Sequence, residues 1–382
     1  MKLDSILIQG YRPFGSFTAP LGPLEVLVGA NGSGKSSLFE FLRFLRDSLH
    51  QDIPPEIVAG SIGQQIFHKP GPDRFLWKLV VGSGERPLFS YKGGLSGPVG
   101  RVQVSFEKIE WVPEMNFDPQ LLMRVQEGSG FFQTSYEKQE IVLRRPNQLA
   151  LSIATNPRFE TPYSLREYIR GWRFYSSFNI SHEKIRQPVP IEQEPVLQED
   201  AGNLSSMLHY MYTEHALLFD ELQQHLRSMV PGFQGLAVKA RGGPGQVIAF
   251  WKEQGVEGDL SLADLSDGTL RLLCWVALCL QPNPPSLICI DEPDQGVHPR
   301  TLPLLAGLFE KASDRTQILL ATHASYFLLQ FDLQRIAVLR KENGEAKFFK
   351  PADSAALTSN LEDFGAEEIE VMHRSDELER LA

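Results

Sequence analysis

The stretch that decides the fold is Leu24–Leu45, LEVLVGANGSGKSSLFEFLRFL. It starts with a short apolar run, passes through a turn rich in glycine, and ends in a segment whose apolar residues recur every three or four positions. That spacing puts apolar side chains on one face of a helix, here Leu38, Phe41, Leu42, Leu45 and Leu49. The order predicts a buried strand over 24–28, a tight loop and a helix over 35–49.

The loop itself, Gly29–Ser36, matches the phosphate-binding pattern G-x-x-x-x-G-K-[ST]. Its glycines let backbone N–H groups turn inward around phosphate oxygens, and the following helix adds the positive end of its dipole. Lys35 has the reach to contact the β- and γ-phosphates, and the Ser36 hydroxyl is a ligand for Mg²⁺. A flexible loop with a chance Gly-Lys-Ser is the alternative, but the predicted strand and helix on either side favour a nucleotide site. The residues expected to bind ATP here are Asn31, Gly32, Ser33, Gly34, Lys35, Ser36 and Ser37.

The composition is that of an ordinary globular protein, with 42% hydrophobic and 22% charged residues in a chain of 382. The net charge of −10 disfavours a surface that is basic throughout, although a local basic groove for nucleic acid remains compatible with it. No apolar run reaches the roughly 18 residues of a membrane span, and the first residues, MKLDSILIQG, are typical of a strand rather than a signal peptide. We therefore expect no membrane partner and a cytoplasmic location.

The cysteines support the same location. All three lie in apolar runs, and their spacing suits neither a zinc site nor a disulfide framework. Buried thiols in a reducing cytosol are the expectation for Cys274, Cys279 and Cys289.

Two groups of strands are predicted around the loop. Residues 2–10 and 14–18 look like strands that build one sheet with 24–28. After the helix, segments separated by glycine-containing turns predict an inserted antiparallel sheet, with strands over Phe75–Val81, Pro87–Tyr91 and Arg101–Trp111.

Two glutamines, Gln64 and Gln65, precede that inserted sheet. One of them has the chemistry to contact Mg²⁺ and the attacking water. A solvent-exposed loop glutamine is an equal alternative, and the sequence does not decide which of the two would take the role.

Helices are expected in the middle of the chain, over Pro119–Gln126, Ser164–Trp172 and Asn203–Val230, the last ending at Pro231-Gly232. Arginines gather there beside aromatic residues, an arrangement that can bind a nucleic-acid strand. A helix with an apolar face and an arginine rim is the interpretation we prefer for this group, which comprises Arg144, Arg145, Arg166, Arg170 and Arg173. Hairpins are predicted across 241–245 and across Asn343-Gly344.

Polar side chains end two further predicted strands. The apolar run 286–290 precedes Asp291 and Glu292, and Gln317–Ala321 precedes Thr322 and His323. Ligands bind at the carboxyl edge of open α/β sheets, so these positions are suited to ATP chemistry. Asp291 would hold Mg²⁺ through water, Glu292 would orient and deprotonate the attacking water, and His323 would donate a hydrogen bond to the γ-phosphate. A strand-ending acidic pair and a structural histidine are the alternatives.

A helix start lies between the two groups. Asp264–Arg271 precedes the apolar run Leu270–Leu280, and either Ser266 or Asp267 is a suitable N-cap, with Gly268 allowing close approach. Taken alone, this segment is a capped core helix. Its position shortly before Asp291 makes a functional role the favoured interpretation.

The order of these motifs resembles the ABC-class ATPases. The phosphate loop, LSDGT, the apolar strand ending in IDEP, and ATH fit the SMC/RecF/OLD-like branch, most closely the predicted AAA-family ATPases of bacteria. Only the combination is specific. The resemblance implies that Ser266 and Gly268 form the signature loop, Asp294–His298 the D-loop, and His323 the switch histidine.

The chain departs from the transporter ATPases in two ways. LSDGT replaces LSGGQ, and the whole of 36–290 separates Lys35 from Asp291. Both favour the branch that acts on chromosomes or in defence. Only 324–382 follow His323, too few for the Toprim nuclease domain of an OLD protein, so we expect no nuclease within the chain.

The resemblance implies an α/β fold: an ABC-type ATPase head with a mostly parallel central sheet, an antiparallel β subdomain and a helical arm or lid. The expected domains are an N-terminal lobe over 1–112, the arm over 113–235 and a C-terminal lobe over 236–382. Two copies would face each other head to tail, with ATP on Lys35 of one copy closed over by Ser266 of the other.

The function implied is an ATP-hydrolysing switch that uses ATP and Mg²⁺. It would regulate a DNA-directed or nuclease partner encoded nearby, in phage defence or DNA repair, with DNA as a further partner. The alternative is an ATP-dependent assembly scaffold with little turnover. A transporter ATPase awaiting a membrane subunit is disfavoured by the two departures above.

Overall fold

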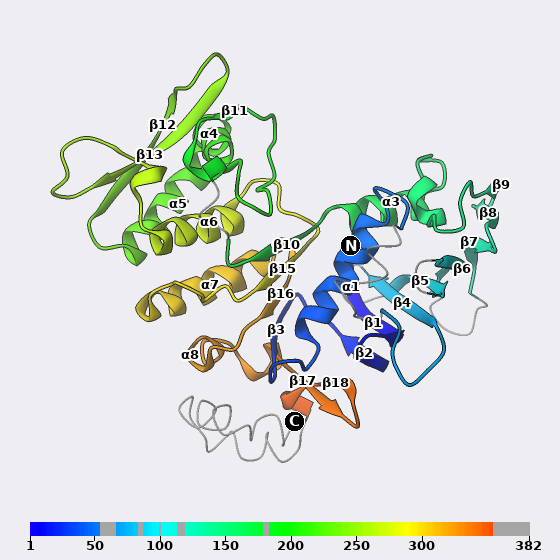
Figure 1. The fold of residues 1–382 in the computed structure, drawn as a ribbon. Coiled ribbons are helices and arrows are strands. Elements are labelled where there is room, and N and C mark those ends of the chain that lie inside the picture. The colour runs from blue at the N-terminus through cyan, green and yellow to red at the C-terminus, as the bar shows by residue number, and fades with distance from the viewer. Residues whose placement is uncertain (54–65, 83–86, 99–100, 113–118, 179–182, 354–382) are drawn as a thin grey trace. The chain divides into compact units, whose positions relative to one another are not determined.

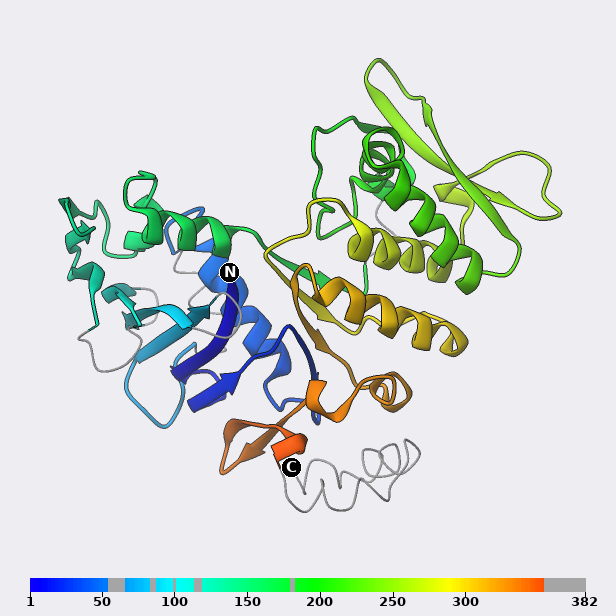
Figure 2. The ribbon, with the colours of Figure 1, turned by 180° about the vertical axis from the view of Figure 1, so that it is seen from behind.

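The computed structural model describes residues 1–53, 66–82, 87–98, 101–112, 119–178 and 183–353. The chain forms two compact units (Figures 1 and 2). The first contains Met1–Trp172 and the described residues from Leu333 onward, and the second contains Arg173–Asp332. The three domains predicted from the sequence, 1–112, 113–235 and 236–382, stay a prediction.

An eight-stranded antiparallel sheet dominates the first unit, in the order β2-β1-β4-β5-β6-β7-β8-β9. Its strands are β1 Lys2–Tyr11, β2 Phe14–Pro20, β4 Arg74–Gly82, β5 Pro87–Ser96, β6 Gln103–Trp111, β7 Leu121–Gln126, β8 Ser129–Gln133 and β9 Lys138–Val142. The predicted antiparallel sheet is therefore confirmed, and it also takes in the strands predicted over 2–10 and 14–18.

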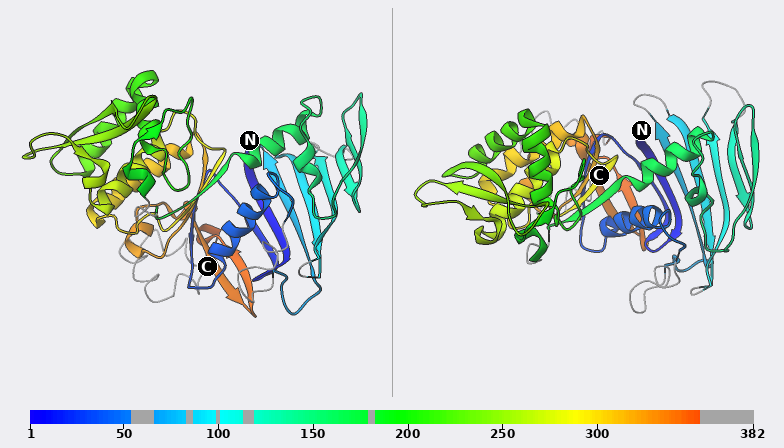
Figure 3. Two further views of the ribbon diagram at one scale, coloured as in Figure 1. Left: turned by 45° about the horizontal axis from the view of Figure 1, so that its top comes forward. Right: turned by 90° about the horizontal axis from the view of Figure 1, so that it is seen from above.

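One face of this sheet packs against helix α1, Lys35–Asp47, as Figure 3 shows. The strand β4 alternates, with Phe75, Trp77, Leu79 and Val81 buried. The ring of Phe75 lies 6.2 Å from that of Phe41 and 5.7 Å from that of Phe44, both on α1. Each fully buried side chain of this size contributes roughly 1.5–3 kcal/mol. The phosphate loop, which α1 follows directly, is thus anchored by an aromatic core.

Strand β3, Leu24–Val28, does not join β1 and β2 as expected. It pairs in parallel with β17, Ile336–Glu342, which in turn pairs antiparallel with β18, Glu345–Phe349. The reason is burial: all five residues of β3 are buried, as in a strand covered on both faces, whereas β1 alternates. The predicted hairpin is confirmed, with Asn343 and Gly344 at φ of 52° and 86°.

The helix predicted over Pro119–Gln126 is wrong, because this segment contains strand β7. Met123 and Val125 are buried while Arg124 and Gln126 are exposed, a period of two that is typical of a strand with one buried face. The helix predicted over Ser164–Trp172 is α3, Glu160–Arg170; Trp172 already begins strand β10, Trp172–Ser176.

The segment that follows β9 is held against the sheet by a buried carboxyl group. Glu107 accepts hydrogen bonds from the Tyr91 hydroxyl at 2.7 Å, from the Leu151 N–H at 3.3 Å and from the Ala150 N–H. Burial raises the pKa of Glu107 to about 7, and these hydrogen bonds oppose the rise. Ala150 and Leu151 are thereby fixed relative to β6.

The long helix predicted over Asn203–Val230 is two helices in the second unit, α4 Leu204–Glu214 and α5 Ala216–Met229. His215 separates them, with φ of −134°. Residues 212–217 contribute no buried side chain, so the break lets each helix turn its own apolar stripe inward without burying this polar stretch.

The parallel strands of the second unit carry the predicted acids. The order is β10-β15-β16, and β15, Leu287–Asp291, runs parallel to β16, Gln317–Ala321. A smaller sheet contains β11 Val189–Pro190, β12 Phe233–Ala240, β13 Gln246–Glu253 and β14 Leu260–Ser261. The pairing of β12 with β13 confirms the hairpin predicted across 241–245.

Helices α6 Asp267–Leu280, α7 Leu302–Ser313 and α8 Ser325–Leu328 complete the second unit. The α6 side chain of Trp275 packs 4.3 Å from the ring of Phe178 and 6.1 Å from that of Phe309. The remaining short helices are 3₁₀ turns: η1 Ala150–Ile153, η2 Glu183–Arg186, η3 Leu262–Asp264, η4 Pro299–Thr301, η5 Leu333–Arg335 and η6 Pro351–Asp353.

The predicted burial of the thiols is confirmed. Cys274, Cys279 and Cys289 are buried and form no disulfide among the described residues, and burial raises the pKa of Cys274 and of Cys279. Among the described residues, no helix is both long and apolar enough to cross a membrane.

Candidate nucleotide site

The phosphate loop in the first unit has the conformation that its glycines allow. Gly29, Gly32 and Gly34 have φ of 147°, 78° and 116°, which side-chain-bearing residues rarely adopt. At Gly29 a Cβ atom would also lie 2.1 Å from the Leu339 carbonyl oxygen of β17. Glycine is therefore required there both by the turn and by the close approach of the neighbouring strand.

The polar groups of the loop suit an anionic ligand. Lys35 is 5% exposed, and its Nζ donates to the carbonyl oxygens of Gly29 and of Ala30, the latter at 3.3 Å. The Ser33 hydroxyl is buried and has no hydrogen-bond partner among the residues that the structure describes. A buried ammonium group and an unpaired hydroxyl are costly unless a ligand compensates them. Asn31 and Ser36 are exposed and Ser37 is half-buried, so these residues remain accessible at the mouth of the loop.

In the second unit, Asp291 and Glu292 stand where β15 ends. Asp291 lies opposite Ala321 of β16, and the Glu292 N–H donates to the Ala321 carbonyl oxygen at 2.8 Å. Glu292 has φ of 52°, a left-handed conformation that costs a non-glycine residue about 1–2 kcal/mol. Such strain concentrates at functional sites, where the surroundings hold a side chain in one direction.

The first residue of the predicted D-loop, Asp294, is tied to the end of β16. The Thr322 hydroxyl donates to Asp294 at 2.7 Å, and the Ala324 N–H donates to the same hydroxyl at 3.0 Å. His323, between these two residues, is exposed. The structure thus gathers Asp291, Glu292, Asp294 and His323 at the carboxyl edge of two neighbouring parallel strands. The sequence named Thr322 as half of the polar pair that ends this strand, but gave it no role of its own.

Ser266, rather than Asp267, is the N-cap of α6. Its hydroxyl accepts from the Thr269 N–H at 3.1 Å and lies 2.8 Å from the Thr269 hydroxyl. A Cβ atom at Gly268 would lie 2.7 Å from the Gly296 carbonyl oxygen, so glycine lets the start of α6 approach the D-loop. These residues line a hollow of about 380 Å³ whose wall also includes Val297, His298, Arg300 and Thr301.

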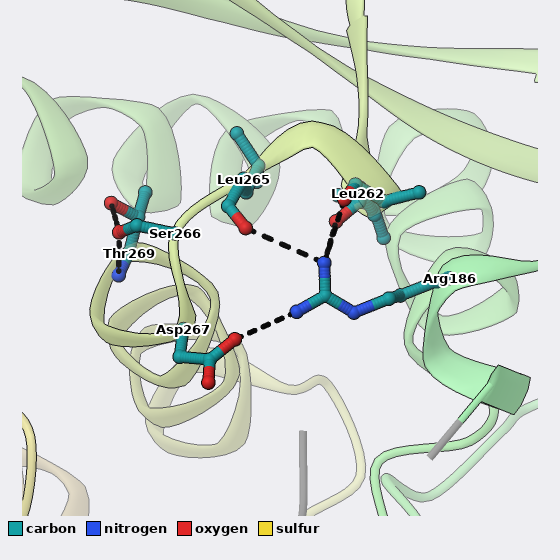
Figure 4. Close-up of polar contacts among 7 residues, drawn as sticks. Arg186, Leu262, Leu265, Ser266, Asp267 and Thr269 are labelled. Atoms are coloured by element: carbon teal, nitrogen blue, oxygen red, sulfur yellow. Dashed lines mark hydrogen bonds and ion pairs between the residues drawn. The ribbon is translucent and has the colours of Figure 1, made fainter. Parts of the chain in front are cut away.

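Arg186, which the sequence did not single out, holds the loop that leads into α6 (Figure 4). Its guanidinium donates to the Ala263 carbonyl oxygen at 2.8 Å and to the Asp267 carboxylate at 2.8 Å. It also reaches the carbonyl oxygens of Leu262 and Leu265, each at 3.4 Å. One side chain from η2 therefore positions the residues on both sides of Ser266.

Arg186→Ala is expected to lower ATP-driven dimerisation and turnover by about 10- to 100-fold, which corresponds to the 1.5–3 kcal/mol of a charge-assisted hydrogen bond. Binding of a fluorescent ATP analogue to a single copy should not change, because the phosphate loop belongs to the other unit. Steady-state phosphate release and size-exclusion chromatography with ATP measure the two effects, and Arg186→Lys should restore part of both.

The matched control is Arg315→Ala. Arg315 lies in the same unit and also donates to two carbonyl oxygens, those of Gln281 at 2.9 Å and Pro282 at 2.8 Å. Both variants should lose some thermal stability, but only Arg186→Ala should lose dimerisation. Equal effects of the two variants would show that Arg186 has a structural role alone.

The predicted residues fall in two groups. The phosphate loop belongs to the first unit, while Ser266, Gly268, Asp291, Glu292 and His323 belong to the second. Gln64 and Gln65 lie outside the described residues. Within the described ranges, no three His, Cys, Asp or Glu side chains are placed to hold a metal ion, so Ser36 and Asp291 as Mg²⁺ ligands stay a prediction. Their oxygens nevertheless fit Mg²⁺, which usually takes one or two protein ligands beside phosphates and water.

The strands, the phosphate loop and the acidic strand end define an α/β nucleotide-binding ATPase domain. Residues 129–329, more than half of the chain, match the family model "AAA domain, putative AbiEii toxin, Type IV TA system", and residues 1–80 match the model "AAA ATPase domain". The chain belongs to this family of AAA ATPase domains. No curated protein matches it.

Solved structures of SMC heads share the fold. One is the SMC head bound to the C-terminal winged-helix domain of ScpA, with 13% identity, a TM-score of 0.55, and coverage of 91% of this chain and 98% of that one. Another is the SMC head from Pyrococcus furiosus with an extended coiled coil, bound to the C-terminal domain of ScpA. It has 11% identity, a TM-score of 0.51, and coverage of 94% and 99%. At these identities the likeness establishes the fold alone, and it confirms the predicted α/β fold of an ATPase head.

Proposed function

We propose that this protein is an ATP-hydrolysing switch that dimerises head to tail around ATP and regulates a DNA-directed or nuclease partner. The phosphate loop carries this conclusion, because three glycines at positive φ shape its backbone and the buried Lys35 ammonium is costly to maintain without an anionic ligand. The family description, which names a putative toxin of a toxin–antitoxin system, supports a setting in antiviral defence, with DNA repair as a second setting.

Each residue of the loop has a role in binding. The backbone N–H groups of Asn31–Ser37 would surround the phosphates at the start of α1, and Lys35 would exchange its carbonyl partners for the β- and γ-phosphates. Mg²⁺, held by Ser36 and through water by Asp291, would neutralise charge on the phosphates.

Hydrolysis would depend on the end of β15. Glu292 would orient a water in line with the γ-phosphate and accept its proton, and its constrained backbone supports a fixed direction for the carboxylate. His323, exposed at the end of β16, would donate a hydrogen bond to the γ-phosphate. Breaking the bond between the β- and γ-phosphates would then remove the contact that His323 senses.

The second copy would complete the site. Ser266 caps a 14-residue helix whose free N–H groups are suited to the γ-phosphate of a facing copy, and Gly268 keeps that approach open. Loss of the γ-phosphate would loosen the pair. The effector, expected to be a nuclease encoded nearby, would respond to this cycle in the cytoplasm.

Lys35→Ala tests the proposal. Removing the ammonium group should lower both ATP affinity and turnover at least about 100-fold, because the strongest contact with the transferred phosphoryl group is lost. Isothermal titration and phosphate release measure the two effects, and Lys341→Ala, an exposed lysine of the same unit, serves as the control. Unchanged turnover in Lys35→Ala would contradict the proposed site.

A further inference from the structure

The outer face of the eight-stranded sheet carries a line of positive charges. Lys78 of β4 lies directly opposite Lys92 of β5, Lys92 opposite Lys108 of β6, and Lys108 opposite Arg124 of β7. Directly paired residues point to the same side of a sheet, so all four side chains share the face opposite α1. We call these four residues the basic row; with strands 4.7–4.9 Å apart, it extends about 14 Å.

Such a register is unfavourable for the fold. Like charges directly opposite each other destabilise a sheet, and here three successive pairs repeat the conflict. Glu110 compensates part of it, because it pairs with Lys92 at 2.8 Å and with Lys108. No ion pair of Lys78 or Arg124 is found among the described residues. In a chain of net charge −10, this concentration of positive charge is a local departure that a ligand would explain.

The row leads into a hollow that is also basic. A space of about 860 Å³ lies over β6 and β7, and its wall includes four cations, Lys108, Arg124, Arg144 and Arg145, against two carboxylates, Glu107 and Glu127. Arg144 and Arg145 are exposed, next to Pro146, whose carbonyl oxygen accepts from the Val104 N–H of β6 at 2.7 Å. Arg145 also pairs with Asp52. The positively charged side chains therefore extend from the basic row into the hollow.

Aromatic rings border the same line. Phe131 of β8 lies opposite Arg124 and so extends the row by one strand, with Lys138 Nζ 4.2 Å from its ring centre. Phe106 lies two residues from Lys108 on the same face and lines the hollow. Both rings are half-buried. Cations in line beside half-exposed aromatic rings are suited to the phosphates and bases of one nucleic-acid strand.

We propose that the basic row and its hollow bind single-stranded nucleic acid. A duplex offers phosphates but keeps its bases stacked inside, so Phe106 and Phe131 would have no partner. An acidic peptide offers carboxylates but lacks the planar bases that Phe106 and Phe131 would stack against. The inference deepens the proposed function by naming the partner and its surface. Because binding is measured without ATP, either idea can fail alone.

The test is fluorescence anisotropy with labelled single-stranded DNA of about 20 nucleotides at about 0.1 M salt. Each phosphate contact on a single strand contributes about 0.7 to the salt slope, so Lys78→Ala with Arg124→Ala should weaken binding about 25-fold and reduce the slope by about 1.4. Lys252→Ala with Lys341→Ala removes the same charge from exposed positions off the row and should change affinity little. Phe106→Leu should weaken binding without changing the salt slope.

A second readout separates binding from folding. Lys78→Gln removes one like-charge pair, so it should raise Tm by roughly 1–3 °C while weakening binding about fivefold. A variant that is more stable yet binds less tightly cannot be explained by misfolding.

Three outcomes would overturn the proposal. The first is that the double variant and its control lose affinity for single-stranded DNA equally. The second is that duplex DNA or polyglutamate competes as effectively as unlabelled single-stranded DNA. The third is that the wild type does not bind single-stranded DNA at low salt. The first would reduce the effect to net charge, and the second would assign the surface to another class of partner.

Discussion

Glu292→Gln will lower ATP turnover by about 10²- to 10⁴-fold while ATP binding persists, because the variant keeps the shape of the side chain and loses the base that accepts the proton of water. ATP-bound dimers should then accumulate, since the step that separates the two copies no longer occurs. Phosphate release measures the loss of turnover. Size-exclusion chromatography with light scattering, with and without ATP, measures the dimer.

The control for this variant is Glu310→Gln, which makes the same chemical change on α7 in the same unit. It should keep wild-type turnover. If wild type and Glu292→Gln form identical, long-lived ATP-bound dimers and neither turns over, the protein is an assembly scaffold rather than a hydrolytic switch. Retained turnover in Glu292→Gln would remove Glu292 from its assigned role.

Ser266→Arg should abolish ATP-driven dimerisation and lower turnover at least about 100-fold, while one copy still binds ATP. The larger side chain would fill part of the 380 Å³ hollow between the start of α6 and the D-loop, where the facing nucleotide is expected. The substitution also removes the hydrogen bond to the Thr269 N–H, worth about 1 kcal/mol of helix stability. ATP binding, dimerisation and turnover are read by the same three assays.

Two variants separate these effects. Ser266→Ala removes the cap but adds no bulk, so it should reduce dimerisation only in part. Ser228→Arg places the same side chain on an exposed position of α5 and should leave all three assays unchanged. Full dimerisation and turnover in Ser266→Arg would exclude a composite site formed by two copies.

The features predicted best from the sequence are those set by neighbouring residues. The strand, loop and helix of Leu24–Leu45 could be predicted because glycine spacing and apolar periodicity are local. The hairpin at Asn343-Gly344 followed from the turn type that these two residues favour. The apolar run before Asp291 was long enough to predict a covered strand.

Features set by distant partners were missed. Strand β3 pairs with β17, more than 300 residues later in the chain, and its burial on both sides was the only local sign that it leaves the first sheet. In β7, the alternation of Met123 and Val125 was readable but was outweighed by helical spacing over a short window.

The residues of the predicted site also divide into those set by neighbouring residues and those set by distant partners. Ser266 and Asp267 were equal candidates for the cap, and only the hydrogen bond to Thr269 decides between them. The positive φ of Glu292 depends on its contact with Ala321, which no spacing predicts. Arg186 acts across a gap of 76 to 81 residues and belongs to no motif.

The central claim is that Ser266 of one copy meets the phosphate loop of another when ATP is bound. Its most direct test is crosslinking with a short bismaleimide between a tagged Ala30→Cys protein and a differently tagged Ser266→Cys protein, each also carrying Glu292→Gln. Both positions are exposed, and the native thiols are buried. We predict a covalent pair containing both tags that forms with ATP and not with ADP. No crosslink with ATP, or one that forms equally without nucleotide, would contradict the account.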